Sequence, residues 1–513
     1  MGLLSPDAVI PTDRPSRTSG PKRESHDRMT AVRPVARRWL PAAGPGLLML
    51  IVGLVGSTVP VLSWDEIATA DVAHRSAAQI WNTVHHIDGV FGPYYLSMHG
   101  WTTLFGDSVL SLRLPSILAM AAAAALTGEL GRRLFGSATG VVAGFLLCLL
   151  PNISRYAAEA RPYALTCLFS ILALLLLHRA LESPGPGRWA AYAAVVLGLG
   201  LCSLVAMTAL AGHAMILLLR LREKRARRRT LSLPWLAAVL TSTVMLGPLI
   251  RWGLLQRHTQ LHWVPPMTVG AVYTFPSYLV GSTEVAWLLI GVLLLAATKP
   301  SRPVVEMVLA AATPLAVTCA VSFAGPSFWV NRYLLFVLMP TVIVAAAGLT
   351  RLRAGTKPHR QVLPLAIALT VFVAAVIPWQ IAIRQPTVKN GSDYRTLASA
   401  IISRQQPGDD LVFEKGRTMR TGVEYYLRHD NARPRDILLE KPAAVLGTLT
   451  AAEYPGPANR LASATRIWLI AYGRRTDPAT ARPDLRKLLL DHYRRSGRWE
   501  VKDGSMALYV KHP

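Results

Sequence analysis

Charged residues are scarce in this sequence: they make up 16% of 513 residues, against roughly 25% in an ordinary soluble domain. The four cysteines all fall inside apolar stretches and lack metal-ligand spacing, which argues against a disulfide framework or a zinc site. The GxxxxGK(S/T) loop of ATP motors is also missing. Neither a D-x-D metal motif nor a repeat of 20 to 50 residues is present. These absences disfavour a soluble, metal-templated or ATP-driven protein.

Apolar residues dominate instead: 52% of the chain is hydrophobic, and the mean hydropathy is +0.33. Apolar stretches long enough to cross a bilayer recur along most of the chain, which predicts a polytopic α-helical membrane protein. We expect eleven spanning helices, at about residues 43–62, 108–131, 137–156, 162–181, 188–203, 205–220, 232–252, 284–298, 304–323, 331–349 and 362–383.

The net charge of +26 comes from basic clusters in the short segments between these apolar stretches. The segment from Arg220 to Arg229 holds seven basic residues, whereas Asp65 to Asp107 holds five carboxylates and a single arginine. By the positive-inside rule, the N-terminus is cytoplasmic and the 63–107 loop is extracytoplasmic. The same clustering disfavours a nucleic-acid partner. We therefore expect a multi-pass protein of the cell membrane.

Composition divides the chain into three parts. Residues 1–40 are rich in Pro, Ser and basic residues and should form a disordered cytoplasmic arm; Met29 is an alternative start, and a signal peptide is a rival interpretation of the basic and apolar segment after it. Residues 41–384 form the transmembrane core. Residues 385–513 alternate strand-like and helical runs and predict a small extracytoplasmic α/β domain. Its basic residues either face solvent or bind an acidic cell-wall polymer: Arg474, Arg475, Arg486, Lys487, Arg494 and Arg495.

The carboxylate pair Asp65-Glu66 comes directly after the first apolar stretch. Adjacent helical residues point about 100° apart, so the two carboxylates would not share a proton but could each do separate work. The alternative is that both merely begin an exposed amphipathic helix. The rest of the loop is too apolar for a solvated linker and too broken by Gly and Pro to span, which predicts helices lying in the interface.

Arginines lie at the same predicted outer boundary, against the charge rule. Arg113 starts the second span, "RYAAEARPY" places Arg155, Glu159 and Arg161 in one turn, and Arg332 begins the tenth span. Each alone could anchor to lipid headgroups. Together with the carboxylate pair they suggest a phosphate ligand. A carboxylate could take a proton from an acceptor hydroxyl while guanidinium groups stabilise a departing lipid phosphate.

Several motifs resemble one family. "SWDE", "GPYYLSMHGWTTLFGDSVLSLRLPSILA", "GRRLFG", "EARPYAL", "HWVPP" and "NRYLLFVLMP" are similar to glycosyltransferase family 39 and its C-fold relatives, the protein O-mannosyltransferase-like and aminoarabinose-transferase-like enzymes. The resemblance runs from about residue 60 to 350. It implies a C-fold membrane glycosyltransferase that transfers a sugar, mannose by analogy or another hexose or pentose, from a polyprenyl-phosphate donor to an extracytoplasmic acceptor with inversion.

The resemblance also implies roles for single residues. Asp65 would be the general base or orient the acceptor, and Glu66 would support it or bind the sugar or a metal. The donor phosphate would contact Arg113, Arg161 and Arg332, with Glu159 positioning Arg161. His262, Tyr94 and Tyr333 would line the cleft.

Two departures from the family pattern stand out. Gly92-Pro93 replaces two consecutive prolines, and "LCSLVA" lacks a His-Tyr pair. A divalent cation held by His85, His86, Asp88 and Glu66 stays open as a cofactor, although adjacent histidines suit one ion poorly. The acceptor could be a glycan, a lipid or a protein. The competing functions are a lipid or glycolipid transporter or flippase, for which mid-membrane charges would be expected, and a non-catalytic cell-envelope assembly protein.

Overall fold

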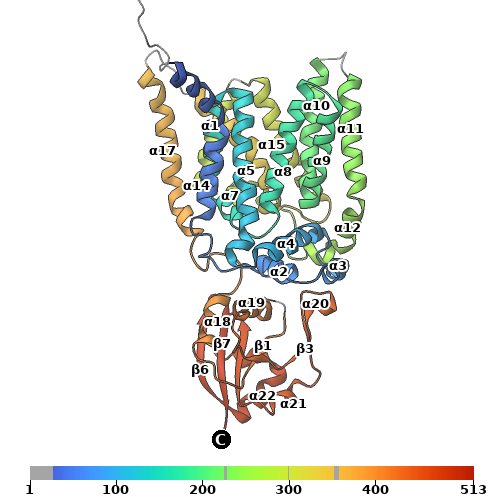
Figure 1. Cartoon of the computed structure of the whole chain (residues 1–513), viewed down its shortest axis with the longest axis vertical. Coiled ribbons are helices and arrows are strands. Elements are labelled where there is room, and N and C mark those ends of the chain that lie inside the picture. Colours follow the sequence, from blue (N-terminus) through green and yellow to red (C-terminus); the bar gives the residue numbers. More distant parts are fainter. Residues whose placement is uncertain (1–26, 224–227, 299, 352–357, 417) are drawn as a thin grey trace, which may run out of the picture.

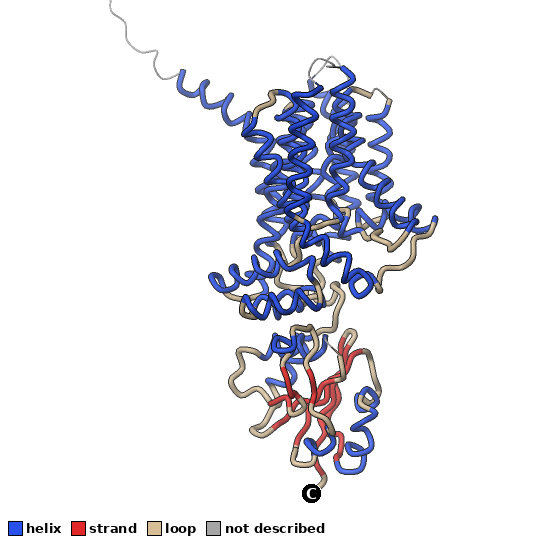
Figure 2. Tube along the Cα trace, turned by 90° about the vertical axis from the view of Figure 1, so that its right-hand side faces the viewer, coloured by secondary structure: helices blue, strands red, loops and turns tan. Residues whose placement is uncertain are grey.

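The computed structural model describes residues 27–223, 228–298, 300–351, 358–416 and 418–513. A bundle of long helices forms one end, a layer of short helices lies beneath it, and a small domain of strands and helices comes last (Figure 1). In the view turned by 90°, the strands are confined to that last domain (Figure 2). The predicted division into a helical core and an α/β tail therefore matches the architecture.

The bundle is built from fourteen α-helices within the described residues, several of them joined by tight bends. They are α1 (Asp27–Leu54), α5 (Val109–Phe135), α6 (Ser137–Leu149), α7 (Pro151–Ala157), α8 (Tyr163–Glu182), α9 (Pro186–Cys202), α10 (Ala209–Glu223), α11 (Arg228–Met245), α12 (Gly247–Leu261), α13 (Val269–Val280), α14 (Thr283–Ala297), α15 (Arg302–Ala324), α16 (Leu338–Arg351) and α17 (Pro358–Ala382).

Five of the described segments are individually long and apolar enough to cross a membrane: Val109–Phe135, Tyr163–Glu182, Val205–Glu223, Arg302–Ala324 and Leu363–Ala382. Three bent pairs also qualify if each pair is one span, and Trp39–Leu54 and Leu335–Arg351 are shorter apolar helices. With α9, these segments coincide with all eleven predicted spans. The chain is a multi-span membrane protein.

Some boundaries differ from the prediction. Helix α1 begins at Asp27, so residues 27–40, expected as disordered, are helical, while residues 1–26 of the predicted arm lie outside the described residues. This helix ends at Leu54 instead of continuing to residue 62. Helix α13 was not predicted; it meets α14 at 96°. The predicted span 137–156 is bent by 71° before Pro151, which begins α7, because proline lacks the amide that would continue α6.

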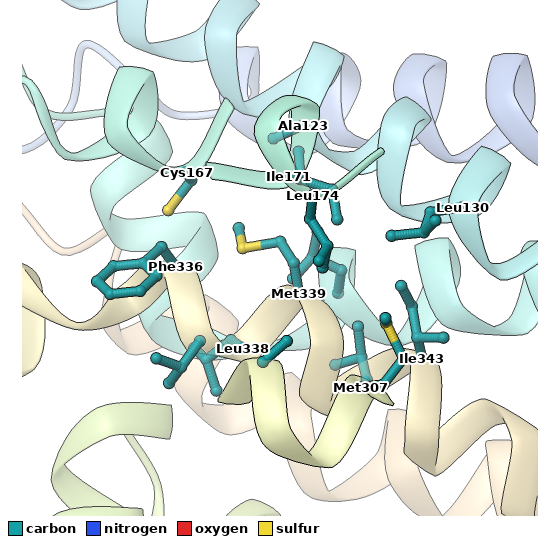
Figure 3. Close-up of a cluster of buried hydrophobic side chains, with 14 of the residues drawn as sticks. Ala123, Leu130, Cys167, Ile171, Leu174, Met307, Phe336, Leu338, Met339 and Ile343 are labelled. Atoms are coloured by element: carbon teal, nitrogen blue, oxygen red, sulfur yellow. The ribbon is translucent and has the colours of Figure 1, made fainter. Parts of the chain in front are cut away.

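Small residues bring the bundle helices into close contact. A Cβ on Gly128 of α5 would lie 1.8 Å from the backbone oxygen of Pro41 in α1, and one on Gly140 of α6 would lie 2.4 Å from the oxygen of Gly128. Glycine at such crossings lets helix backbones pack directly. Elsewhere in the bundle, side chains from α5, α8, α15, η5 (Leu335–Val337) and α16 interlock (Figure 3): Ala123, Leu130, Cys167, Ile171, Leu174, Met307, Phe336, Leu338, Met339 and Ile343.

The predicted outer loop folds into three short helices, α2 (Trp64–Ala73), α3 (Ala77–His86) and α4 (Gly92–Phe105), with the 3-10 turn η1 (Gly89–Phe91) between the last two. They lie across one end of the bundle, between it and the C-terminal domain (Figure 1). The loop and the tail therefore share one end of the molecule, as an odd number of spans requires. That this end faces outward stays a prediction.

The C-terminal domain contains a five-stranded mixed sheet in the order β2-β1-β5-β7-β6. Strands β1 (Asp409–Phe413), β2 (Arg435–Asp436) and β5 (Arg466–Tyr472) are parallel, and the hairpin β6 (Tyr493–Val501) and β7 (Gly504–Lys511) is antiparallel. A separate pair joins β3 (Leu439–Lys441) and β4 (Ala452–Glu453). Its helices are α18 (Tyr394–Ile402), α19 (Thr418–Leu427), α20 (Ala443–Leu446), α21 (Pro457–Leu461) and α22 (Pro483–His492).

Two details of the tail differ from the prediction. The run "DILLE", expected as one strand, is divided between β2 and β3. The helical run expected to include "HYRRS" ends at His492, because Tyr493 already begins β6 and its hydroxyl donates to the carbonyls of Leu461 and Ala464. The hairpin turn predicted at Asp503-Gly504 is present, with Asp503 at a positive φ of 50°.

Alternation along the strands gives the sheet two buried faces. One face, with Leu411 and Trp468, packs with α18 and α19 into a core that continues into α2 and α4 through Ile67 and Tyr95. The other face packs against α22. Because the first core is shared, the C-terminal domain packs against the short helices α2 and α4 and is not merely tethered to them.

Candidate active site

Helix α2 begins at a capping box that fixes the direction of the carboxylate pair. The Ser63 hydroxyl accepts from the Glu66 amide at 3.3 Å, and the Glu66 carboxylate accepts from the Ser63 amide at 3.0 Å. Such reciprocal bonds satisfy two amides at a helix N-terminus and favour acidic side chains there. The expectation that the pair begins a helix is therefore met, but the two carboxylates point into different surroundings.

The Glu66 carboxylate is completely buried. It accepts from Arg113 Nε at 2.7 Å and Nη2 at 2.9 Å, from Lys389 Nζ at 2.9 Å and from the Ala160 amide at 3.1 Å. Burial alone would raise the pKa of Glu66, but the positive charges of Arg113 and Lys389 and these hydrogen bonds outweigh it and hold the pKa well below its usual range. Glu66 is thus a permanently ionised structural anchor.

Lys389 was not anticipated from the sequence, where it is a lone lysine between the last span and the tail. Its ammonium group is buried, donates to the Ala158 carbonyl at 2.7 Å, and lies 3.7 Å from the Glu159 carboxylate. The segment that leads into the C-terminal domain is thereby tied to the base of α2 and to the turn between α7 and α8. Only the folded chain brings these three segments together.

Asp65 projects to the opposite side, where its side chain is 35% exposed. One carboxylate oxygen lies 3.6 Å from Nη1 of Arg332. The Arg332 guanidinium lies 4.6 Å from the ring centre of Trp263, and that of Arg161 lies 4.0 Å from the ring centre of Phe91. Aromatic faces hold both cations in place without neutralising them. An accessible carboxylate therefore stands beside cations that can still bind an anion.

These groups line a cavity of about 1080 Å³. Its walls come from the outer helices, from the bundle ends of α7, α11, α12 and α15, and from the C-terminal domain. Apolar residues such as Leu204, Leu246 and Ile250 line it together with the charged residues Asp65, Arg155 and Arg332. Such a cavity suits a ligand with an apolar tail and an anionic head.

Six of the nine predicted site residues line this cavity: Asp65, Glu159, Arg161, His262, Arg332 and Tyr333. The other three do not. Glu66 and Arg113 are engaged with each other, and Arg113 also donates to the carbonyls of Ser57 and Pro60. Tyr94 is buried, and that burial raises its pKa.

The predicted role of Glu159 also changes. Its side chain faces Lys389, and its link to Arg161 is a backbone contact, from the Arg161 amide to the Glu159 carbonyl at 2.8 Å. Arg161 Nη1 instead donates to the Tyr95 hydroxyl at 3.5 Å. Glu159 therefore acts on the buried lysine and not on the arginine.

The predicted cation ligands are not gathered at one point. His85 and His86 are exposed and each bonds a carbonyl of its own helix, Asp88 accepts from the Tyr95 hydroxyl at 2.8 Å, and Glu66 is occupied as above. Among the described residues, no group of three His, Cys, Asp or Glu side chains is arranged to hold a metal ion. The four predicted ligands are therefore not arranged to hold one cation together.

Comparison with known proteins agrees with this architecture. Residues 92–252 match the model of the family described as dolichyl-phosphate-mannose-protein mannosyltransferase. ArnT from Cupriavidus metallidurans in the apo state has a TM-score of 0.58 at 14% identity, over 94% of this chain and 98% of that one. The chain has the C fold of membrane glycosyltransferases. This confirms the predicted fold class, and the match to the family model over residues 92–252 agrees with the predicted family resemblance.

Two further solved structures are similar. ArnT bound to undecaprenyl phosphate has a TM-score of 0.55 at 13% identity and covers 90% of this chain and 96% of that one. AglB from Archaeoglobus fulgidus, in complex with an inhibitory peptide and a dolichol-phosphate, is 11% identical with a TM-score of 0.44, over 92% of this chain and 75% of that one. No curated protein matches the sequence.

Proposed function

We propose that this protein is a glycosyltransferase that transfers a sugar from a polyprenyl-phosphate donor to the hydroxyl of an extracytoplasmic acceptor, with inversion. The observation that carries the proposal is Asp65, which faces a cavity beside the aromatic-held Arg332. The similar ArnT structure bound to undecaprenyl phosphate supports a lipid phosphate as the donor carrier. Mannose is the first sugar to test, because of the family whose model matches.

In the proposed step, the Asp65 carboxylate accepts the proton of the acceptor hydroxyl while the oxygen of that hydroxyl attacks the anomeric carbon of the donor sugar. The new carbon–oxygen bond forms on the face opposite the bond to phosphate, which breaks, so the configuration inverts. The bonding electrons leave with the lipid phosphate, whose added negative charge is stabilised by Arg332 and, from their places on the cavity wall, by Arg155 and Arg161. The proton on Asp65 is then lost to water.

Two aspects of the proposal depend on the surroundings of the site. The predicted orientation puts the cavity on the extracytoplasmic side of the cell membrane, where the donor would be lipid-linked and the acceptor would be an envelope component. The proposed step uses the side chains of the protein, with Asp65 as the base and arginines beside the departing phosphate.

The test uses purified full-length protein in nanodiscs with polyprenyl-phosphate mannose and, separately, lipid-linked sugars extracted from source membranes. Asp65→Asn keeps the size and hydrogen bonding of the side chain but removes the base. We expect turnover to fall at least about a hundredfold, with donor binding retained. Glu440→Gln, a change of an exposed carboxylate on β3, is the matched control. Undiminished transfer by Asp65→Asn, or lipid movement without transfer, would contradict the proposal.

A further inference from the structure

The C-terminal domain forms part of the cavity wall. From residue 390 onward, four residues line the cavity: Asn390, Thr421, Leu449 and Tyr472. Two of them contact Trp64 at the start of α2: the Asn390 carbonyl accepts from the Trp64 amide, and the Tyr472 ring lies beside the Trp64 ring. This agrees with the position of α2 between the bundle and this domain (Figure 1). Segments some 400 residues apart in sequence therefore meet beside the proposed base.

At this meeting point, two aromatic rings remain exposed. The rings of Trp64 and Tyr472 have centres 6.0 Å apart and planes tilted by 59°, and each residue is 40% exposed. Most large side chains at a docked interface are buried, so two partly exposed rings on a cavity wall can contact a ligand.

Backbone contacts hold both rings in place. The Trp64 amide donates to the Asn390 carbonyl at 3.0 Å, and a Cβ on Gly391, whose φ is +133°, would lie 3.0 Å from the Trp64 ring. Glycine thus allows the chain to pass directly beneath the indole. The Tyr472 amide donates to the Glu414 carboxylate at 2.5 Å, and Arg475 Nε donates to the Tyr472 carbonyl at 3.1 Å. These contacts fix the backbone of both residues.

We infer that Trp64 and Tyr472 form the acceptor subsite and that the acceptor is a carbohydrate. This inference rests on the proposed function. A pyranose ring presents an apolar face of C–H groups that packs on aromatic rings, while its hydroxyl groups bind nearby polar side chains. Asp71 and Asn390 supply such polar groups on the same wall. Because Trp64, Tyr472 and Asp65 all line one cavity, a sugar on this platform can present a hydroxyl to the base.

The position of the strands disfavours a peptide acceptor that adds to the sheet. Strand addition to a sheet edge is one of the ways in which proteins capture an extended peptide. The edges of the five-stranded sheet are β2 and β6, and no described residue of either strand lines the cavity. The strand that reaches the cavity is β5, which lies in the middle of the sheet and contributes only the side chain at its end.

The experiment labels acceptors from the source cell envelope. Full-length protein in nanodiscs is given radiolabelled polyprenyl-phosphate sugars extracted from source membranes, together with delipidated envelope material. The products are then separated into protease-resistant oligosaccharide and protease-released glycopeptide. We expect the label in the oligosaccharide. Label in glycopeptides would overturn the carbohydrate acceptor and leave the proposed function standing, whereas no label in either fraction would overturn both.

Variants test the two rings directly. Tyr472→Leu and Trp64→Ala should each raise the acceptor concentration for half-maximal labelling about tenfold, equivalent to about 1.4 kcal/mol, with the donor KM unchanged. Tyr472→Phe keeps the ring and should behave as wild type. Trp81→Ala, an exposed tryptophan of α3 that does not line the cavity, is the control. An unchanged acceptor dependence in Tyr472→Leu would refute the platform even if Trp64→Ala fails to fold.

Discussion

Neutralising Glu66 and neutralising Asp65 should have different effects, because Glu66 stabilises the fold and Asp65 acts in the reaction. The buried carboxylate of Glu66 accepts hydrogen bonds from an arginine, a lysine and two backbone amides. Glu66→Gln therefore leaves Arg113 as an uncompensated buried charge and Lys389 with only the Glu159 carboxylate, 3.7 Å away. Removing one partner of a buried ion pair costs about 3 to 5 kcal/mol. Asp65→Asn loses only a partly exposed pair at 3.6 Å, which is worth about 0 to 1 kcal/mol.

The assay measures thermal unfolding in nanodiscs alongside sugar transfer. We expect Glu66→Gln to lower Tm clearly, and Asp65→Asn to retain the wild-type Tm while losing turnover. In a double-mutant cycle, Glu66→Gln and Lys389→Met together should lower the free energy of unfolding by less than the sum of their separate effects, with a difference of about 0.5 to 3 kcal/mol. A Glu66→Gln protein with wild-type Tm and the turnover defect of Asp65→Asn would refute the assignment of Glu66 as an anchor.

The pH dependence of the same variant provides a second check. The pKa of Glu66 is lowered in the folded protein, so its contribution to stability is present above the unfolded pKa of about 4.5 and is lost only as pH falls below it. Between pH 5 and 9 the Tm difference between wild type and Glu66→Gln should therefore stay constant. A difference that changes near neutral pH would mean that the carboxylate titrates there and is not held by its cationic partners.

Three further outcomes are expected. Burial, followed by the charge of Asp436, raises the pKa of Glu424 in α19 to about 7. The free energy of unfolding should therefore fall as pH rises from 4.5 to 7, by up to about 3 kcal/mol. Glu424→Gln should remove this pH dependence from the measured Tm. Lys389→Met should release the linker to the C-terminal domain, seen as faster limited proteolysis near that residue than in Lys441→Met, an exposed control. Arg332→Lys keeps the charge but loses the planar contact with Trp263, so the donor KM should rise about tenfold with Tm unchanged; an unchanged donor KM would exclude Arg332 from the phosphate site.

The local sequence pattern predicted the helices of this protein well, because the length of an apolar stretch and the charges at its ends can be recognised within a short segment of sequence. The eleven spans coincide with helices, and the short outer helices and the α/β tail were expected from composition alone. Boundaries failed where a local break was ambiguous. Helix α13 contains Pro276 in its interior, which is more typical of a loop than of a helix. Helix α22 ends where β6 begins to pair with β7, and the helical pattern of the α22 segment contains no sign of that pairing.

The sequence by itself determined that Asp65 and Glu66 begin a helix after the first span and that arginines share their end of the bundle. It could not distinguish the two carboxylates, because their difference depends on what packs against each face of α2. Tertiary structure alone buried Glu66 against Arg113 and Lys389, turned Asp65 toward Arg332, and brought Tyr472 beside Trp64. The charge interactions and the burial of each carboxylate depend on side chains that are close in space. Those side chains lie from about 50 to 400 residues away along the chain.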